Sequence, residues 1–381
     1  MSKRTVLTNA RIVCPVRDFA GTLVIEDGVI ADILSHRVVD GIDLNGAILT
    51  PGIIDIHTDY LERELAPRPT ARIPLELALH VMELRAISCG LTTIATAARI
   101  SEEGDGLVGS WRSEGIPLAK QLQHLIPQMR ARHMIHIRWS TSFDPVEGAL
   151  DEVLKLKNVA NLVFNDDTPG QRQFPNIEVL SQQRASHKNI SIEAARKEIQ
   201  DRIERGQSVN NRKKVEAQVS GKIPLGSHDD TTIEHVLEAY ECGATLSEMP
   251  CSIDAARKAK ELGMLVCMGA PNYYRGGSHC GNLSCHDAMG ENLVDIICSD
   301  YHFPSMLACA IRMAESGMTL SAAINMLTLN PARYLGLDKE TGSIGLGKRA
   351  DLTAFYPRAG FGEVIRVWVD GKEILHTPAA G

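Results

Sequence analysis

Short apolar runs alternate with helix-like or loop-like segments through the middle of this 381-residue chain. Eight of the runs have the length of a strand, and the first, with Ile53, Ile54 and Ile56, is rich in β-branched residues, as expected for strands buried on both faces. The eight runs cover residues 53–56, 92–98, 134–140, 161–167, 223–230, 245–250, 265–272 and 295–301. Eight strand–helix units predict an α/β fold, a (β/α)8 TIM barrel.

Four of the intervening segments have the pattern of helices, at residues 75–89, 191–205, 232–242 and 253–262. Gly90, Gly243 and Gly263 stand just beyond three of them, where glycine commonly ends a helix. A doubly wound sheet is the alternative architecture. No G-x-G-x-x-G pattern follows a predicted strand, however, so the barrel is favoured.

The two ends of the chain differ from the middle. Short strands and turns are predicted at 6–13, 21–26, 29–34 and 43–49, and the same style returns at 350–356 and 364–369. We expect both ends to pair into one small β-sandwich domain. The predicted division is residues 1–51 with 338–381 for the β-sandwich, and 52–337 for the barrel.

Polar side chains end five of the predicted barrel strands. His57 and Asp59 are two residues apart and share one side of a strand, although this pair alone would also fit a surface loop. The other strand ends carry Asp166, His228, Glu248 and Asp300. Several carboxylates at one barrel mouth are costly without a cation, so the pattern predicts a divalent metal site. Asp229, Asp230 and Asp254 are expected to cap helices instead.

Composition narrows the function by exclusion. The formal net charge of -7 gives no basic field for nucleic acid. No apolar run has bilayer length and no signal peptide is evident, which predicts a cytoplasmic protein that does not bind membranes. The nine cysteines form no CxxC pair, so neither a disulfide framework nor a cysteine zinc site is expected. Cys267 and Cys298 lie in apolar runs and are expected to be buried.

Three stretches resemble the amidohydrolase superfamily along nearly the whole chain. They are Asn9-Ala-Arg-Ile, Leu49-Thr-Pro-Gly-Ile-Ile-Asp-Ile-His57 and Gly345-Leu-Gly-Lys-Arg-Ala-Asp-Leu352. This resemblance implies a metal-bearing (β/α)8 barrel with a β-sandwich built from both termini.

Longer stretches are similar to the PhnM family of phosphonate metabolism, which hydrolyses the triphosphate of a ribose 1-alkylphosphonate and releases diphosphate. They are His57-Thr-Asp-Tyr-Leu-Glu62 with Pro67-Arg-Pro69, Asp166-Asp-Thr-Pro-Gly-Gln-Arg-Gln-Phe174, Ser227-His-Asp-Asp-Thr-Thr232, Gly269-Ala-Pro-Asn272 with Arg275-Gly-Gly-Ser-His279, and Ser299-Asp-Tyr301. Two positions depart from that family: Ser140 stands where its pattern has a Glu, and Asp167 where it has a His.

The resemblance and the residue types together suggest roles. The expected metal ligands are His57, Asp59, Asp166, His228 and Asp300, with Asp300 also the general base. The expected substrate-binding residues are Arg68, Thr168, Glu248, Arg275, Ser278 and His279. Glu248 has the alternative role of a metal ligand or of a partner to a ligating histidine. We expect one or two divalent ions, zinc before manganese or iron, a small anionic substrate and a homodimer.

Three function classes remain open from the sequence. Phosphoanhydride hydrolysis is favoured by the Thr-Pro-Gly-Gln and Arg-Gly-Gly-Ser-His runs, since metal binding requires neither. Hydrolysis of a cyclic amide, or deamination, would use the same metal–water chemistry. A non-catalytic binding protein that kept the barrel is the third class, and Ser140 and Asp167 favour the second and third.

Overall fold

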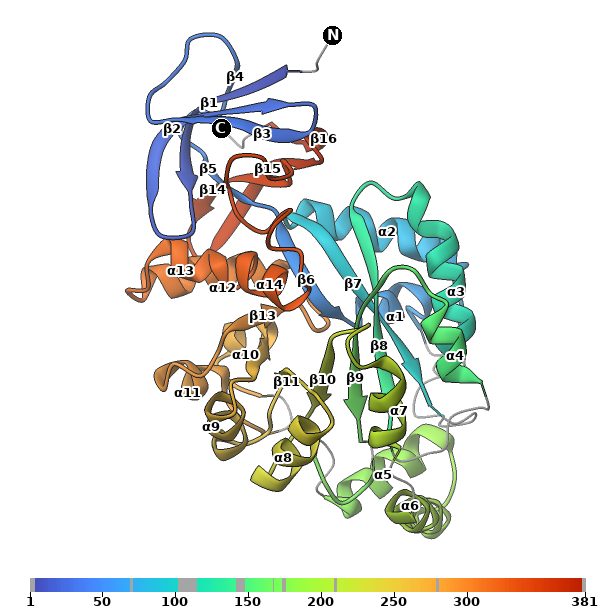
Figure 1. The fold of residues 1–381 in the computed structure, drawn as a ribbon. Helices are drawn as coiled ribbons and strands as arrows, with labels where there is room; N and C mark the ends of the chain where they lie inside the picture. Colours follow the sequence, from blue (N-terminus) through green and yellow to red (C-terminus); the bar gives the residue numbers. More distant parts are fainter. Residues whose placement is uncertain are drawn as a thin grey trace.

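The computed structural model describes residues 4–68, 71–101, 115–141, 148–166, 168–172, 176–208, 211–278 and 281–378. Within them the chain forms a nearly closed barrel of parallel strands and a separate sheet built from both ends of the chain (Figure 1). The predicted fold class is therefore confirmed. Where the chain divides into domains stays a prediction.

The barrel contains eight strands in sequence order, each hydrogen-bonded in parallel to the next. They are β6 (Ile53–Thr58), β7 (Leu91–Ile100), β8 (Arg132–Ser140), β9 (Val159–Asn165), β10 (Leu225–His228), β11 (Leu246–Glu248), β12 (Leu265–Gly269) and β13 (Ile296–Cys298). The prediction of a strand over 265–272 was too long. Helix α10 begins at Ala270, because Pro271 has no N–H for the ladder and suits the first turn of a helix.

The barrel closes between its first and last strands at the level of the polar residues. Thr58 and Asp300 form a parallel bridge. The Asp300 N–H donates to the His57 carbonyl at 3.2 Å, and the Asp59 N–H donates to the Asp300 carbonyl at 2.7 Å. Closure by these backbone bonds therefore brings His57, Asp59 and Asp300 together at the mouth.

Helices pack around and at the ends of the barrel. They are α1 (Tyr60–Leu65), α2 (Leu75–Ser88), α3 (Gly115–Leu125), α4 (Ala149–Leu154), α5 (Ile177–Lys188), α6 (Ile192–Ser208), α7 (Arg212–Val219), α8 (Ile233–Glu241), α9 (Ile253–Glu261), α10 (Ala270–Arg275), α11 (Cys285–Gly290), α12 (Pro304–Glu315), α13 (Leu320–Asn325), α14 (Leu329–Tyr334) and the 3-10 turn η2 (Ile126–Gln128). All except α5, α6 and α14 contribute to the largest apolar cluster, which they form with the strands. Gly90, Gly243 and Gly263 have positive φ just beyond α2, α8 and α9, as predicted. Among the described helices, none is long and apolar enough to cross a membrane.

A smaller apolar cluster fills the inside of the barrel. It contains Ile54, Ile56, Leu246, Cys267, Ile296, Cys298, Ala332 and Tyr334. Cys267 and Cys298 are fully buried, as expected. Because these apolar side chains, two of them from α14, fill this interior, the polar strand ends lie above an apolar cluster.

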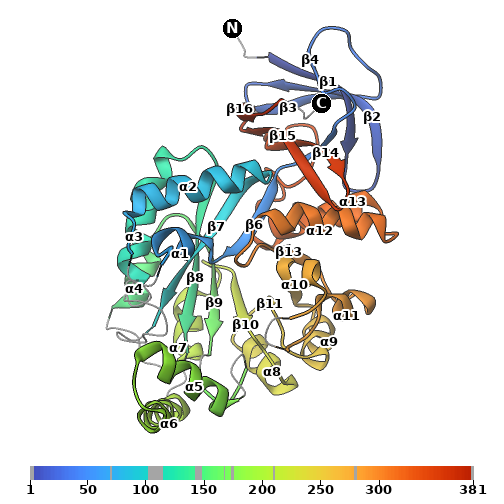
Figure 2. The same ribbon diagram turned by 180° about the vertical axis from the view of Figure 1, so that it is seen from behind.

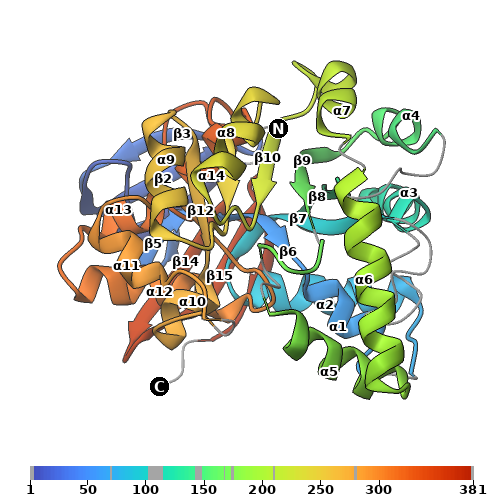
Figure 3. The same cartoon turned by 90° about the horizontal axis from the view of Figure 1, so that it is seen from below.

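The terminal sheet joins the two ends of the chain. Its strands are β1 (Arg4–Val13), β2 (Asp18–Glu26), β3 (Val29–Leu34), β4 (Ile42–Asp43), β5 (Ile48–Pro51), β14 (Leu352–Arg358), β15 (Phe361–Val369) and β16 (Lys372–His376). Strands β5 and β14 pair antiparallel and join the two halves, whereas β4 and β5 run parallel to β1. Figures 1 and 2 show this sheet at one end of the barrel and α5 and α6 at the other. The view in Figure 3 is from the α5–α6 side.

Candidate active site

The mouth of the barrel holds a carboxylate surrounded by imidazoles. Oε2 of Glu248 lies 3.0 Å from Nδ1 of His57, 3.8 Å from Nε2 of His136 and 3.9 Å from Nε2 of His228. All four side chains are buried. His57, His228 and Glu248 each offer one atom within 4.8 Å of the others, and we call them the first donor set.

His136 is a residue that sequence reasoning did not single out. Its Nδ1 lies 2.7 Å from Oδ1 of Asn161, whose Nδ2 donates to the Tyr334 hydroxyl at 3.4 Å. A signal existed in the sequence: His136, Arg138 and Ser140 alternate along β8 and so share one face of the strand. This signal was missed because apolar residues alternate with these three, so the stretch has the pattern of an ordinary strand.

A second group of donors overlaps the first. His57, Asp59 and Asp300 also bring one atom each within 4.8 Å of one another, and we call them the second donor set. Oδ2 of Asp59 lies 3.7 Å from Nε2 of His57 but only 2.7 Å from Nη1 of Arg138. The second donor set therefore has an arginine as neighbour.

Burial and neighbouring charges shift the protonation of these groups. Burial raises the pKa of Asp300 to about 6. Burial by itself would raise the pKa of Glu248 too, but the adjacent His57 imidazole lowers that pKa to about 2. Burial lowers the pKa of His136 to about 3 and so keeps this imidazole neutral. The site thus combines an ionised Glu248 with a neutral imidazole of His136.

The first donor set fits a divalent cation. Both oxygens of Glu248 and both ring nitrogens of His57 and His228 are buried, and none makes a hydrogen bond of proper geometry within the described part of the chain. Buried polar atoms of this kind are costly unless a ligand satisfies them. Imidazole nitrogen and carboxylate oxygen are ligands that zinc and similar ions accept.

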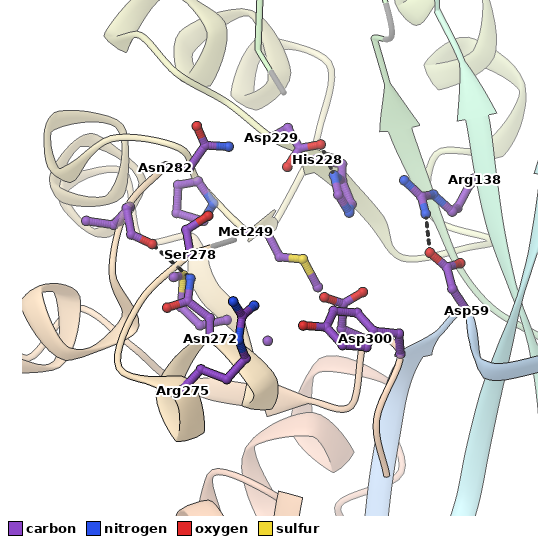
Figure 4. A pocket seen from close by; sticks show the side chains of 15 residues that line it. Asp59, Arg138, His228, Asp229, Met249, Asn272, Arg275, Ser278, Asn282 and Asp300 are labelled. Atoms are coloured by element: carbon purple, nitrogen blue, oxygen red, sulfur yellow. Dashed lines mark hydrogen bonds and ion pairs between the residues drawn. The ribbon is translucent and has the colours of Figure 1, made fainter. Parts of the chain in front are cut away.

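A cavity of about 190 Å³ reaches the first donor set at His228. Asp59, Arg138, His228 and Asp300 form its deep side, and Arg275 reaches toward it from the opposite side (Figure 4). Further lining residues are Asp229, Met249, Pro250, Met268, Gly269, Asn272, Ser278, Asn282, Leu283 and Tyr301. The cavity therefore brings possible metal ligands and two guanidinium groups to one space.

Asp166, predicted as a metal ligand, lies in a different group. Its Oδ2 is 3.5 Å from Nε of Arg172 and 3.6 Å from Nη2 of Arg212, and its Oδ1 accepts the N–H of Thr168 at 3.1 Å. Arg172 also pairs with the buried Asp230. We call Asp166, Arg172, Arg212 and Asp230 the salt-bridge cluster. The structure does not bring Asp166 to the first donor set.

The expectation that Asp230 and Asp254 cap helices was wrong. Thr232 is the N-cap of α8 and Ser252 that of α9, because each hydroxyl accepts the N–H three residues on. Asp230 faces Arg172 instead, and Asp254 pairs with Arg257 at 2.9 Å.

Asp229 does not cap α8 either. Its Oδ2 lies 2.8 Å from Nδ1 of His228, so this carboxylate orients a possible metal ligand.

The remaining predicted substrate residues divide into three groups. Arg275 and Ser278 line the cavity. Arg68 is exposed on the loop after α1, and Thr168 is buried beside Asp166, and neither lines the cavity. His279 lies outside the described residues, as does Asp167, the second departure. Ser140, the first departure, is buried on β8.

Comparison with known proteins places the chain in a family. The pattern described as "Amidohydrolase family" matches residues 184–374. A protein of Escherichia coli (strain K12), alpha-D-ribose 1-methylphosphonate 5-triphosphate diphosphatase, is 30% identical over 378 residues, covering 97% of this chain and 100% of that protein. The chain belongs to the amidohydrolase family and is a hydrolase.

Solved structures with the same fold are more distant in sequence. N-acetylglucosamine-6-phosphate deacetylase from Pasteurella multocida superposes with a TM-score of 0.61 at 15% identity, covering 98% of this chain and 100% of that one. A D-hydantoinase superposes with a TM-score of 0.61 at 15% identity, covering 98% of this chain and 95% of that one. At this identity the likeness extends to the fold alone.

Proposed function

We propose that this chain is a zinc-dependent hydrolase that cleaves a phosphoanhydride bond in an anionic sugar phosphate or phosphonate. The observation that carries the proposal is the cavity itself, which His228 of the buried first donor set lines together with Arg138 and Arg275. Two fixed cations suit a polyphosphate better than an uncharged cyclic amide. The name of the E. coli relative, a diphosphatase acting on a ribose triphosphate, agrees with this substrate class.

The residues for the ion are His57, His228 and Glu248. When bound, a divalent ion lowers the pKa of a water molecule toward neutrality and polarises the phosphoryl group. Oδ2 of Asp229 lies 2.8 Å from Nδ1 of His228, so Nε2 is the nitrogen of that ring that remains for the ion. Asp59 and Asp300, from the second donor set, face the same space.

Asp300 accepts the proton of the attacking water on its carboxylate. Its backbone is held by His57 and Asp59 at the barrel closure, so the carboxylate has a fixed place at the cavity. The general base is thus positioned by the same bonds that close the barrel.

Arg275 binds the part of the substrate that does not react. It is exposed at the end of α10, lines the cavity, and has no ion-pair partner among the described residues. A guanidinium without an internal partner keeps its donors for a phosphate or phosphonate oxygen.

A substrate panel tests the proposal. The metal-loaded protein is mixed with α-D-ribose 1-methylphosphonate 5-triphosphate, ATP, hydantoin and dihydrouracil, and diphosphate release and ring opening are measured. We expect diphosphate from the ribose triphosphate with kcat/KM well above that for ATP, and no ring opening. Ring opening without diphosphate release would establish a cyclic-amide hydrolase instead. Homodimer formation and a cytoplasmic location stay predictions from the sequence.

A further inference from the structure

Arg138 lies beside Asp59 of the second donor set and makes two hydrogen bonds. Its Nη1 donates to Oδ2 of Asp59 at 2.7 Å, and its Nε donates to Oδ1 of Asn165 at 3.2 Å. The side chain is 12% exposed, and that exposure faces the cavity (Figure 4). Two anchors, one just after β6 and one on β9, fix the guanidinium, so its charge has a definite place in the site.

Oδ2 of Asp59 is shared between Arg138 and the second donor set. The same Oδ2 that accepts from Arg138 is the Asp59 atom facing Nε2 of His57, at 3.7 Å. An ion bound by the second donor set would stand against the guanidinium, and like charges at this separation repel strongly away from bulk water. Glu248 of the first donor set pairs only with histidines among the described residues.

The charge balance agrees with this arrangement. The two donor sets contain three carboxylates, those of Asp59, Glu248 and Asp300. One divalent ion and the Arg138 guanidinium neutralise them completely. Asp166, at the end of another strand, is already paired with Arg172 and Arg212 and supplies no ligand for a second ion.

We infer that Arg138 takes the place of a second metal ion. The site binds one divalent ion at the first donor set, and Arg138 supplies the other positive centre of the cavity. The catalytic half of this inference rests on the proposed function, and the metal-binding half does not. In the reaction, the water oxygen bonds to phosphorus, the bond to the leaving phosphate breaks with its electron pair, and the water proton passes to Asp300. Arg138 stabilises the negative charge that grows on the phosphoryl oxygens.

Cobalt titration of the chelator-treated protein tests the metal-binding half. Visible spectra and calorimetry of wild type are expected to show one tight equivalent of Co²⁺ per chain. Two equivalents of similar affinity in wild type would overturn the inference. Arg138→Gln is expected to keep the tight equivalent and its spectrum, whereas loss of all Co²⁺ from the folded variant would mean that Arg138 only supports the site.

Kinetics of the same variants tests the catalytic half. Arg138→Gln should lower kcat by about 10²- to 10³-fold with KM within a few-fold, and Arg138→Lys should recover part of kcat. Arg275→Gln should raise KM instead, and Arg257→Gln, in an exposed ion pair, should match wild type. Wild-type kcat in Arg138→Gln would refute the role. If wild type hydrolyses none of the substrates, the proposed function fails while the cobalt stoichiometry still decides the metal-binding half.

Discussion

Two groups of buried charge lie at the carboxyl ends of neighbouring barrel strands, and they are built on opposite principles. In the salt-bridge cluster, the carboxylates of Asp166 and Asp230 are matched by the guanidinium groups of Arg172 and Arg212. In the first donor set, Glu248 is surrounded by imidazoles, and no arginine or lysine pairs with it among the described residues. The carboxylates of one group are matched by cations of the chain, and the carboxylate of the other has no arginine or lysine partner.

The difference separates structure from function. A matched buried pair holds its loop in place, and breaking it leaves one charge buried and uncompensated. Burying metal-ligating atoms without partners lowers the free energy of unfolding, and a bound ion offsets this loss. Removing a residue from the salt-bridge cluster should therefore affect folding. Removing a residue from the first donor set should affect ion binding and catalysis.

The largest effect is expected from His228→Ala. Loss of one of three ligands should remove most of the bound divalent ion and the activity that depends on it, while the fold remains, because the ring makes no internal hydrogen bond of proper geometry within the described residues. Elemental analysis and a thermal melt measure the two outcomes. A variant with full metal content would show that His228 is not a ligand.

Arg172→Ala should give the reverse pattern. It leaves Asp230, which is fully buried, without its cation, and we expect a loss of about 3–5 kcal/mol in the free energy of unfolding. Urea denaturation measures this loss, and elemental analysis of the folded fraction should give wild-type metal content. An unchanged unfolding free energy together with lost metal would place Arg172 in the metal site instead.

Asp300→Asn should keep the fold and the ion and lose turnover. Asparagine tolerates the positive φ of 56° at this position but cannot accept a proton. At equal metal occupancy, kcat should fall by about 10²-fold or more, which is about 2.7 kcal/mol of transition-state stabilisation. A variant with near wild-type kcat at full occupancy would exclude Asp300 as the base.

The pH profile sharpens this test. Burial raises the pKa of Asp300 to about 6, and a base must be deprotonated, so activity should fall as the pH drops. A bound divalent ion favours the carboxylate, so the acidic limb of kcat/KM should lie below pH 6. Asp300→Asn should lose that limb, and a limb that persists unchanged belongs to another group.

Arg257→Ala is the matched control for Arg172 and should have the smallest effect. Arg257 pairs with Glu291 at 2.7 Å, but both side chains are nearly half exposed. Exposed pairs contribute about 0–1 kcal/mol, so the unfolding free energy and the metal content should stay close to wild type. A loss as large as that of Arg172→Ala would mean that burial does not distinguish the two pairs.

The sequence predicted the barrel and most of its mouth for one physical reason. Strands buried on both faces are apolar throughout, so the polar ends that carry His57, His228, Glu248 and Asp300 stand out from them. Asp166 is also a polar residue at the end of an apolar strand, so the sequence does not distinguish it from the ligands. Its partners Arg172 and Arg212 come from a loop and from α7, and no sequence pattern marks this pairing. His136 was hidden inside β8, since only the face of the strand distinguishes it.

Anomalous diffraction from crystals of protein purified without chelator tests the central claim most directly. Data collected on either side of the absorption edge of the bound metal locate the ion independently of any activity. We predict one strong peak at about 2.0–2.2 Å from nitrogens of His57 and His228 and from an oxygen of Glu248. A strong peak at Asp166 with none at the first donor set, or fully ordered histidines with no ion at all, would contradict the account.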